Sequence, residues 1–255
     1  SLHSHPDLSL VLVGPEDLIR SQLGTQINHP RLQIQHAAEC VEMDESPASA
    51  LRFKKDSSMR VAINLVRDGR ADACVSAGNT GALMAIARFT LKTLPGIDRP
   101  AICGVLPRAT GQVHMMDLGA NVECSANLLF QFGVMATIMV RYLDGIENPS
   151  VGLLNIGIEN IKGNETIREA SELFRNSRLN YQGFVEGDSI FTGNVDIIVC
   201  DGFSGNVALK TSEGLAQMLT KITREAFGHN WYSRVVGGLA LPALKSIFPV
   251  APFVN

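Results

Sequence analysis

Four stretches of this sequence repeat one order: an apolar run, a loop of small and amide residues, and then a helical pattern. The stretches are residues 72–91, 113–143, 151–174 and 195 onward. Alternating strands and helices predict an α/β fold with a doubly wound, mostly parallel sheet and right-handed crossovers. In such a sheet the loops after the strands lie at the carboxyl edge, where ligands bind. We therefore expect the four loops to lie together and to form the functional site.

The first of these loops, residues 76–80, has the composition of an anion site. The apolar run before it fits a buried strand, and Asn79 or Thr80 can cap the helix that follows. Gly78 and Gly81 keep side chains away from the loop, and unpaired N–H groups at a helix N-terminus bind phosphate. The same composition also suits an ordinary strand-to-helix connection, so this loop alone does not decide the function.

The other three loops are rich in amide side chains and contain few charged ones. Their polar residues of interest are Asp117, Asn121, Asn155, Lys162, Asn164, Asp201, Ser204 and Asn206. Neutral amides and glycines suit an anionic ligand that is held by hydrogen bonds, with the few charges left for chemistry. For Lys162 the alternative is an ordinary surface lysine.

Size and composition predict a globular chain with one α/β domain over residues 1–255. The 255 residues are 45% hydrophobic, and the net charge of −3 without a basic run argues against nucleic acid as a partner. The five cysteines are odd in number and form no C-x-x-C pair, which predicts reduced, buried thiols of a cytoplasmic protein. We expect no metal site, and we interpret His36 and His114 as core histidines.

The apolar end of the chain, residues 229–255, contains a predicted amphipathic tip at residues 231–254. Prolines and glycines break this tip into short helical pieces, and its two charges are both positive. Trp231 and Tyr232 favour the headgroup boundary, so the pattern suits the interface of an anionic membrane. The alternative is a helix pair buried in a dimer or subdomain core. We expect no spanning helix, since no charge-free apolar run approaches ~18 residues, and no secretory signal opens the chain.

Two further parts of the sequence predict structural features, one an apolar region and the other a basic cluster. Residues 101–106 and 112–118 are expected to form a hairpin, and the apolar helix at 128–143 is expected to lie in the core or at a subunit interface. A basic cluster lies in and beside two expected helices, residues 48–53 and 57–66; its members are Arg52, Lys54, Lys55 and Arg60. This cluster is either a solvated helix face or a contact for an anion or an acidic partner.

Five motifs are more specific than any of these patterns. They read Pro-x-x-Ala-x-Arg-x-Lys-x-Asp-Ser-Ser-Met at 47–59, Val-Ser-Ala-Gly-Asn-Thr-Gly-Ala-Leu-Met at 75–84, Asp-Leu-Gly-Ala-Asn-Val at 117–122, Leu-Asn-Ile-Gly at 154–157 with Lys-Gly-Asn at 162–164, and Cys-Asp-Gly-Phe-Ser-Gly-Asn-Val at 200–207. In this order they closely resemble the bacterial phosphate acyltransferase family, PlsX. The family's opening Asp-x-Met-Gly-Gly-Asp and closing Tyr-Asn-Gly-Ala and Ser-His-Gly motifs are missing, so we expect this sequence to be a piece of a longer protein.

The resemblance implies an enzyme of phospholipid synthesis that makes acyl phosphate from acyl-acyl-carrier-protein and inorganic phosphate. It also implies a fold related to phosphotransacetylases and isocitrate-type dehydrogenases, and a homodimer. We expect no cofactor, and a cytoplasmic location with peripheral contact at the inner face of the cell membrane.

The resemblance and the loop pattern together assign expected roles to residues. Phosphate needs only to be held and oriented for attack on a thioester carbonyl, and the expected phosphate-binding residues are Ser76, Gly78, Asn79 and Thr80. The expected catalytic residues are Lys162, Asn164, Asp201 and Asn206. Lys162 or Asn206 would donate to the developing oxyanion, and Asp201 would orient phosphate or accept its proton. Further substrate contacts are expected from Asp117, Asn121, Asn155 and Ser204.

Two alternative functions stay open at this stage. A nicotinamide-dependent dehydrogenase on a related fold is disfavoured because no G-x-G-x-x-G follows the first strand. A non-catalytic scaffold that docks acyl carrier protein or a membrane gains some weight from the missing terminal motifs.

Overall fold

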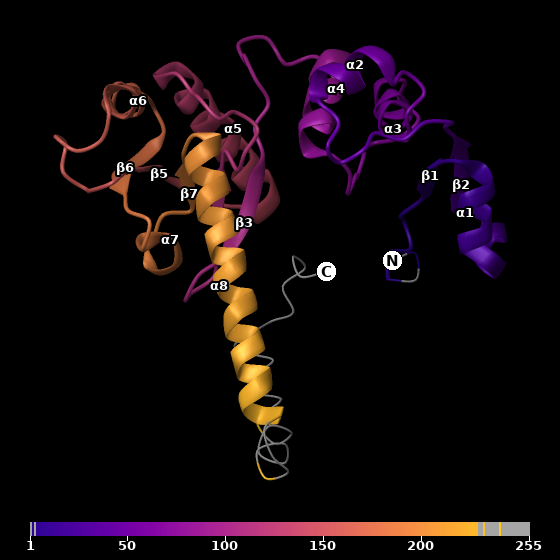
Figure 1. Ribbon diagram of the computed structural model, residues 1–255. Helices are drawn as coiled ribbons and strands as arrows, with labels where there is room; N and C mark the ends of the chain where they lie inside the picture. Colours follow the sequence, from indigo (N-terminus) through magenta and orange to yellow (C-terminus); the bar gives the residue numbers. More distant parts are fainter. Residues whose placement is uncertain (1, 3, 229–231, 233–239, 241–255) are drawn as a thin grey trace. The chain divides into compact units, whose positions relative to one another are not determined.

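The computed structural model describes residues 2, 4–228, 232 and 240, which form two compact units, Ser1–Pro100 and Ala101–Asn255 (Figure 1). These are called unit 1 and unit 2. The expected single α/β domain over residues 1–255 stays a prediction. The expected amphipathic tip, residues 231–254, lies outside the described residues except for Tyr232 and Ala240.

Unit 1 consists of a two-stranded parallel sheet and a group of three helices beyond it in the chain. Its elements are β1 (Leu10–Gly14), α1 (Glu16–Leu23), the 3-10 helix η1 (Gly24–Asn28), β2 (Leu32–His36), α2 (Pro47–Phe53), α3 (Ser58–Arg67) and α4 (Thr80–Leu91). Strand β1 pairs with β2 from Leu10 opposite Leu32 to Gly14 opposite His36. The helices α2, α3 and α4 enclose a small core of Val41, Ala50, Met59, Ile63, Ala82 and Ile86.

Capping side chains fix where the helices of unit 1 begin. The Ser46, Ser57 and Asn79 side chains accept hydrogen bonds from backbone N–H groups in the first turns of α2, α3 and α4. Such a cap satisfies one of the donors that every helix N-terminus leaves unpaired. The sequence left Asn79 and Thr80 as candidates for the cap of α4, and the structure selects Asn79.

One predicted strand of unit 1 is wrong. The apolar run before residue 76 is irregular, and the Val75 side chain is 97% exposed. A strand needs a neighbour that accepts its ladder of hydrogen bonds, and in the described part of unit 1 the only ladder joins β1 to β2. The loop at residues 76–80 therefore does not follow a strand.

Unit 2 is built on a five-stranded sheet in the order β3-β4-β7-β5-β6. Its elements are β3 (Cys103–Pro107), β4 (Gln112–Met116), α5 (Ala126–Asp144), β5 (Ser150–Leu154), α6 (Glu165–Arg175), β6 (Asn180–Val185), α7 (Ser189–Thr192), β7 (Ile197–Val199) and α8 (Gly202–Gly228). Strands β3 and β4 form the predicted antiparallel hairpin, and the pairs β4–β7, β5–β7 and β5–β6 are parallel. The predicted mostly parallel α/β sheet is confirmed in this unit.

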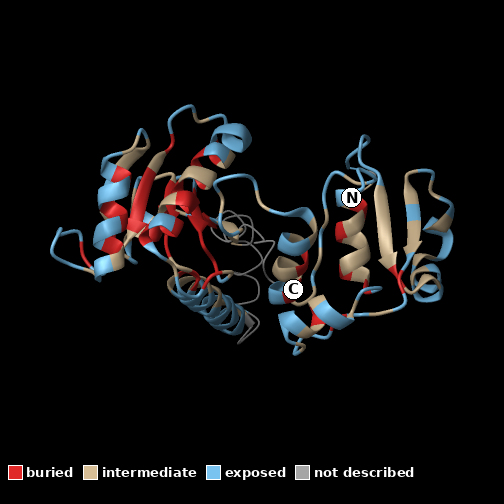
Figure 2. Ribbon diagram, turned by 90° about the horizontal axis from the view of Figure 1, so that it is seen from above, coloured by how far each residue is buried: buried red, intermediate tan, exposed pale blue. Residues whose placement is uncertain are grey.

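The central strands of unit 2 are buried on both faces. Ile197 and Val199 pack in one cluster with α5 and α6, whereas Ile198 and Cys200 pack in a second cluster with residues of α7 and α8. Successive side chains of a strand point to opposite faces, so helices cover both faces of the sheet. Figure 2 shows the buried strands of this sheet with exposed residues on the outer sides of its helices.

Helix α5 is the main core helix of unit 2. Its Leu129, Phe132 and Val140 side chains are buried, and Gly133 lies against Phe174 of α6, where a Cβ would come within 2.3 Å of the Phe174 ring. By length and composition α5 is apolar enough to cross a membrane, but half of its most apolar window is buried inside the protein. The expected core position is confirmed for this face of α5, while Tyr142 on the helix is 87% exposed.

Three further expectations need correction. His114 is buried as expected, but His36 is exposed at the end of the two-stranded sheet. Of the five thiols only Cys200 is fully buried, and Cys40 is exposed. Helix α8 already begins at Gly202, within the expected loop, because the Asp201 carboxylate accepts a hydrogen bond from Ser204 N at 2.8 Å and so supplies an early cap. Ser204 and Asn206 therefore lie on a helix and not in a loop.

Candidate active site

Three of the four predicted site loops start at the same edge of the sheet of unit 2. Strands β4, β7 and β5 are adjacent and parallel, so the segments that follow them share the carboxyl edge. These segments are residues 117–121, 200–206 and 155–164. The fourth loop, residues 76–80, belongs to unit 1.

The segment after β4 is organised by the Asp117 carboxylate, which is completely buried. One oxygen accepts hydrogen bonds from Ile102 N at 2.9 Å and Ala120 N at 3.1 Å, and the other accepts from Asn121 N at 2.7 Å and Asn121 Nδ2 at 2.9 Å. Four donors stabilise an ionised carboxylate away from water. Because both oxygens are used in this way, Asp117 holds the turn in shape and presents its backbone to the site.

The N-terminus of α8 is attached directly to this turn. Gly202 N donates to the Asn121 carbonyl at 2.7 Å, and Asp201 accepts from both the backbone N–H and the hydroxyl of Ser204, the latter at 3.0 Å. The Asn206 side chain lies over Gly119, because a Cβ on Gly119 would meet it at 3.5 Å. The positive end of a 27-residue helix therefore lies beside Asp201 and Asn206.

The segment after β5 is held by Asn155. Its buried side-chain amide donates to the carbonyls of Gly157 at 3.0 Å and Lys162 at 3.4 Å, which closes the loop on itself. Asn164 Oδ1 accepts from Ile167 N at 2.9 Å and so caps α6. The Lys162 side chain is exposed, lies over Gly157 together with that of Glu159, and forms no salt bridge in the described chain.

The loop in unit 1 is held mainly by Asn79. Its Oδ1 accepts from Ala82 N at 3.0 Å, and its Nδ2 donates to the carbonyls of Glu42, Met43 and Glu45 at 2.8–3.2 Å. Ser76 Oγ accepts from Gly78 N at 3.2 Å, and Thr80 is exposed. With the Asn79 side chain used inside the protein, the groups left for an anion in this loop are its backbone N–H groups and the Thr80 hydroxyl.

Apolar side chains near the polar groups of unit 2 were missed by the sequence reasoning. Large hydrophobic side chains that are more than 60% exposed lie in or directly beside all three segments; they are Val122, Ile156, Ile158, Ile161 and Phe203. The available signal was three isoleucines within six residues of a loop, a place where polar residues are usual. A ligand with both an anionic and an apolar part would fit this composition.

The cysteine in this region is not suited to act as a nucleophile. Burial raises the pKa of the Cys200 thiol, and the nearby Asp201 and Asp117 carboxylates raise it further. Its Sγ donates to the Asp117 carbonyl at 3.3 Å, and the thiolate rather than the thiol is the reactive form. Among the described residues no three His, Cys, Asp or Glu side chains are grouped as metal ligands; the expectation of no metal stays a prediction.

Comparison with solved structures gives the class of fold. EutD phosphotransacetylase from Staphylococcus aureus superposes with a TM-score of 0.61 at 17% identity, over 85% of this chain and 77% of that one. A phosphotransacetylase from Streptococcus pyogenes superposes with a TM-score of 0.57 at 18% identity, over 82% of each chain. The chain therefore has the α/β fold of the phosphotransacetylases.

Sequence comparison gives the family. The fatty acid synthesis protein family matches residues 1–251, and the chain belongs to that family. The phosphate acyltransferase of Nitrosococcus oceani is 58% identical over 247 residues, which are 94% of this chain and 71% of that protein. The phosphate acyltransferase of Methylococcus capsulatus is 56% identical over 248 residues, which are 96% of this chain and 73% of that protein. The recognition made from the five motifs is confirmed.

Proposed function

We propose that this chain is a phosphate acyltransferase that makes acyl phosphate from acyl-acyl-carrier-protein and inorganic phosphate. One observation carries the proposal. More than half of the residues of this chain are identical to those of relatives named phosphate acyltransferase, over nearly the whole length of this chain. The geometry of unit 2 is consistent with this reaction. Amide and charged groups lie at the carboxyl edge of one sheet, together with a helix N-terminus and exposed apolar side chains. The dehydrogenase alternative has no comparable support.

The proposed reaction needs no covalent enzyme intermediate. A phosphate oxygen attacks the thioester carbonyl carbon, the C–S bond breaks, and the thiolate that leaves on the carrier takes up a proton. Lys162 and Asn206 donate to the oxyanion that develops on the carbonyl oxygen, and the positive end of the α8 dipole favours this negative charge. Asp201 orients phosphate or accepts its proton. Attack by Cys200 is disfavoured because burial keeps this group in its thiol form.

The other predicted residues are proposed to hold the site in shape. Asp117, Asn121, Asn155 and Asn164 shape the segments that present backbone groups to the substrates, and Ser204 holds the Asp201 carboxylate. Phosphate binding is proposed at residues 76–80, where the Thr80 hydroxyl and the backbone N–H groups that are not already bonded are the donors. The hydrogen bond from Gly78 to Ser76 and the bonds of Asn79 hold the loop.

Trapping of the product tests this function. Purified protein is incubated with acyl-acyl-carrier-protein, phosphate and hydroxylamine, and the acyl hydroxamate that forms from acyl phosphate is measured against a control without phosphate. Phosphate-dependent hydroxamate is the expected result. Binding of the carrier protein without any hydroxamate would instead support the non-catalytic scaffold, and reduction of a nicotinamide cofactor would support the dehydrogenase.

We also propose that the protein works in the cytoplasm at the inner face of the cell membrane. The proposal rests on the sequence pattern of residues 231–254 and on the poor water solubility expected of a long-chain acyl phosphate. Trp231 is the single tryptophan, so its fluorescence reports on this segment alone. Anionic vesicles should shift its emission to the blue in a salt-sensitive manner, and Leu244→Glu should abolish the shift; an emission spectrum indifferent to vesicles contradicts membrane contact.

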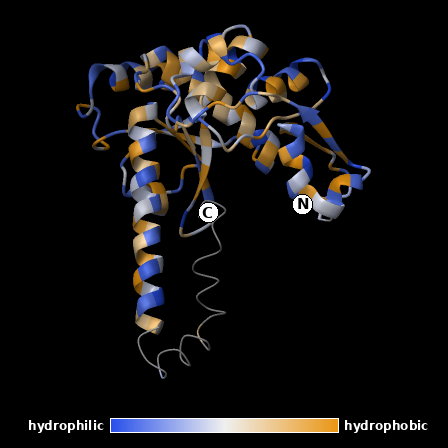
Figure 3. Ribbon diagram, turned by 45° about the vertical axis from the view of Figure 1, so that its right-hand side comes forward, coloured by the Kyte–Doolittle hydropathy of each residue, from blue (hydrophilic) through white to orange (hydrophobic). Residues whose placement is uncertain are grey.

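A homodimer is the third part of the proposal, and α8 supports it. Four of its side chains, spaced three or four residues apart, are 43–53% exposed; they are Leu215, Met218, Leu219 and Ile222. Residues at this spacing lie on one side of a helix. Figure 3 shows apolar residues recurring along this long helix. A second copy of the same helix would cover such a stripe.

A further inference from the structure

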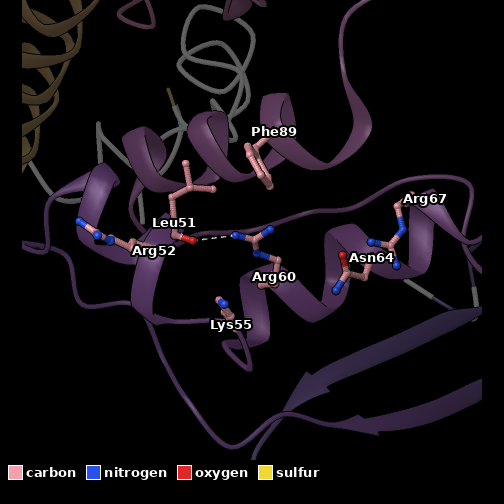
Figure 4. A pocket seen from close by; sticks show the side chains of 7 residues that line it. All are labelled: Leu51, Arg52, Lys55, Arg60, Asn64, Arg67 and Phe89. Atoms are coloured by element: carbon pink, nitrogen blue, oxygen red, sulfur yellow. Dashed lines mark hydrogen bonds between the residues drawn. The ribbon is translucent and has the colours of Figure 1, made fainter.

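Unit 1 contains a cavity of about 520 Å³ whose lining is strongly basic (Figure 4). It lies among α2, α3 and α4 and is lined by Leu51, Arg52, Lys55, Arg60, Asn64, Arg67 and Phe89. Four of these seven residues are cations, and none is a carboxylate. The whole chain carries a net charge of −3, so this concentration of positive charge is local.

The guanidinium of Arg60 is fixed in the middle of this basic cavity. Its terminal nitrogens donate to the Leu51 carbonyl at 2.9 Å and to Thr90 Oγ1 at 3.2 Å, and its central carbon lies 5.7 Å from the Phe89 ring centroid. The Arg60 Nε atom is buried and has no hydrogen-bond partner. A guanidinium held by neutral groups keeps its full charge available to a partner.

The positive charge of the basic cavity is only partly compensated. Arg67 forms two hydrogen bonds with the Asp68 carboxylate, at 2.8 and 3.2 Å. Arg52, Lys55 and Arg60 form no salt bridge in the part of the chain that the structure describes. A solvated helix face usually contains charges of both signs, whereas the residues that line this cavity are charged only positively.

Exposed aromatic rings accompany the cations. Phe53 and Phe89 are 67% and 57% exposed, with Arg52 placed 5.5 Å from the Phe53 centroid and Lys92 placed 4.7 Å from the Phe89 centroid. Arginine and aromatic residues are the types enriched where proteins bind other proteins. This combination favours a docking surface over a purely solvated patch.

We propose that this basic cavity and its rim dock the carboxylate-rich face of the protein that carries the acyl group, an inference that rests on the proposed function. In Figure 4, Arg52 and Arg67 lie toward opposite ends of the cavity with Arg60 between them, and Arg52 points away from the other two. Charges spread along two helices match an extended acidic face better than a single phosphate. Complementary charge of this kind raises the association rate and fixes the orientation of a partner.

Charge reversal tests this docking surface. The test variant is Arg52→Glu with Lys55→Glu, since both side chains are exposed on the rim. The control is Arg20→Glu with Arg70→Glu, an equal charge change in unit 1 on exposed residues that do not line the cavity. Binding of the free acyl carrier protein is measured by calorimetry, and turnover is measured with acyl-acyl-carrier-protein and with an acyl thioester of N-acetylcysteamine.

The test variant should bind the carrier protein at least ~10-fold more weakly and show a similar rise in KM for the acylated carrier, with less dependence on salt. Turnover of the small thioester and the KM for phosphate should not change, and the control should behave as wild type. If the test variant binds the carrier normally, or if the KM for phosphate rises instead, the docking surface is wrong.

Failure of the proposed function is distinguishable from failure of the docking surface. A wild-type protein that makes no acyl phosphate from either thioester lacks the activity, whether or not it binds the carrier. A wild-type protein that makes acyl phosphate but loses nothing on charge reversal keeps the function and lacks this docking surface.

Discussion

Gly205 lies directly against the backbone of Asp117: a Cβ placed on Gly205 would come within 1.9 Å of the Asp117 carbonyl oxygen and 2.8 Å of Cys200 Sγ. This contact presses the first turn of α8 onto the segment that follows β4. The two segments are also tied by the hydrogen bond from Gly202 N to the Asn121 carbonyl. The arrangement of two of the three site segments therefore depends on the absence of a side chain at one position.

Gly205→Ala should lower the free energy of unfolding by roughly 1–3 kcal/mol, because the added methyl group overlaps backbone that is fixed by the sheet. Gly214→Ala in the same helix is a matched control, since a Cβ there meets nothing within 4 Å, and it should raise stability by ~0.5–1 kcal/mol. Urea unfolding measures both. Equal effects of the two substitutions would contradict the close contact.

Asp117→Asn should lower the free energy of unfolding by roughly 1–3 kcal/mol. The carboxylate accepts four hydrogen bonds inside the protein. In asparagine an NH2 group replaces one of the two oxygens, so the N–H groups that now donate to this oxygen would lose their acceptor. Asp188→Asn, at an exposed position, is the control and should change stability by less than ~0.5 kcal/mol. A stable Asp117→Asn protein with lost activity would instead point to a direct substrate contact.

Asp201→Asn should reduce turnover by ~10²-fold or more with a small change in KM, because the charge is lost from the group proposed to orient phosphate or accept its proton. Stability should change little, since asparagine also caps helices well and the bond from Ser204 N can be kept. Steady-state kinetics and urea unfolding of the same preparation separate the two effects. Near-wild-type turnover would mean that another residue orients phosphate or accepts its proton.

Lys162→Ala should likewise reduce turnover more than substrate affinity, by ~10²-fold if the ammonium donates to the developing oxyanion. Its side chain is exposed, so unfolding should be affected by less than ~0.5 kcal/mol. Lys221→Ala, at an exposed position toward the other end of α8, is the control and should leave turnover unchanged. An ordinary surface lysine would give the same result as this control.

The parts of the fold that local sequence fixes were predicted well. Asn79 caps α4 as expected, and Ser57 caps the helix expected at residues 57–66, because a capping side chain and the backbone N–H from which it accepts lie within three residues. The hairpin of β3 and β4 and the alternation of strands and helices along unit 2 follow from short-range patterns in the same way. The motifs then identified the family before any contact was known.

Features that depend on distant partners could not be predicted. The apolar run before Ser76 looked like a strand, but strand formation depends on a neighbour that the run itself does not encode, and Val75 is exposed. Asp117 and Asn155 looked like substrate ligands because they are polar residues at strand ends. Their side chains instead bond to Ile102, Asn121, Gly157 and Lys162, and only the folded geometry shows which polar groups are already used.

The exposed stripe on α8 predicts the oligomeric state. If two copies pair through Leu215, Met218, Leu219 and Ile222, then the double variant Met218→Glu with Leu219→Glu should convert a dimer to a monomer, because buried carboxylates without partners cost several kcal/mol. The side chains of this stripe are about half exposed in the single chain, and a dimer would bury them. The substitutions remove this burial. Sedimentation velocity measures the change directly. Lys221→Glu, which alters charge on the same helix at a position 77% exposed, is the control and should stay dimeric; a double variant that also stays dimeric would mean that another surface joins the subunits.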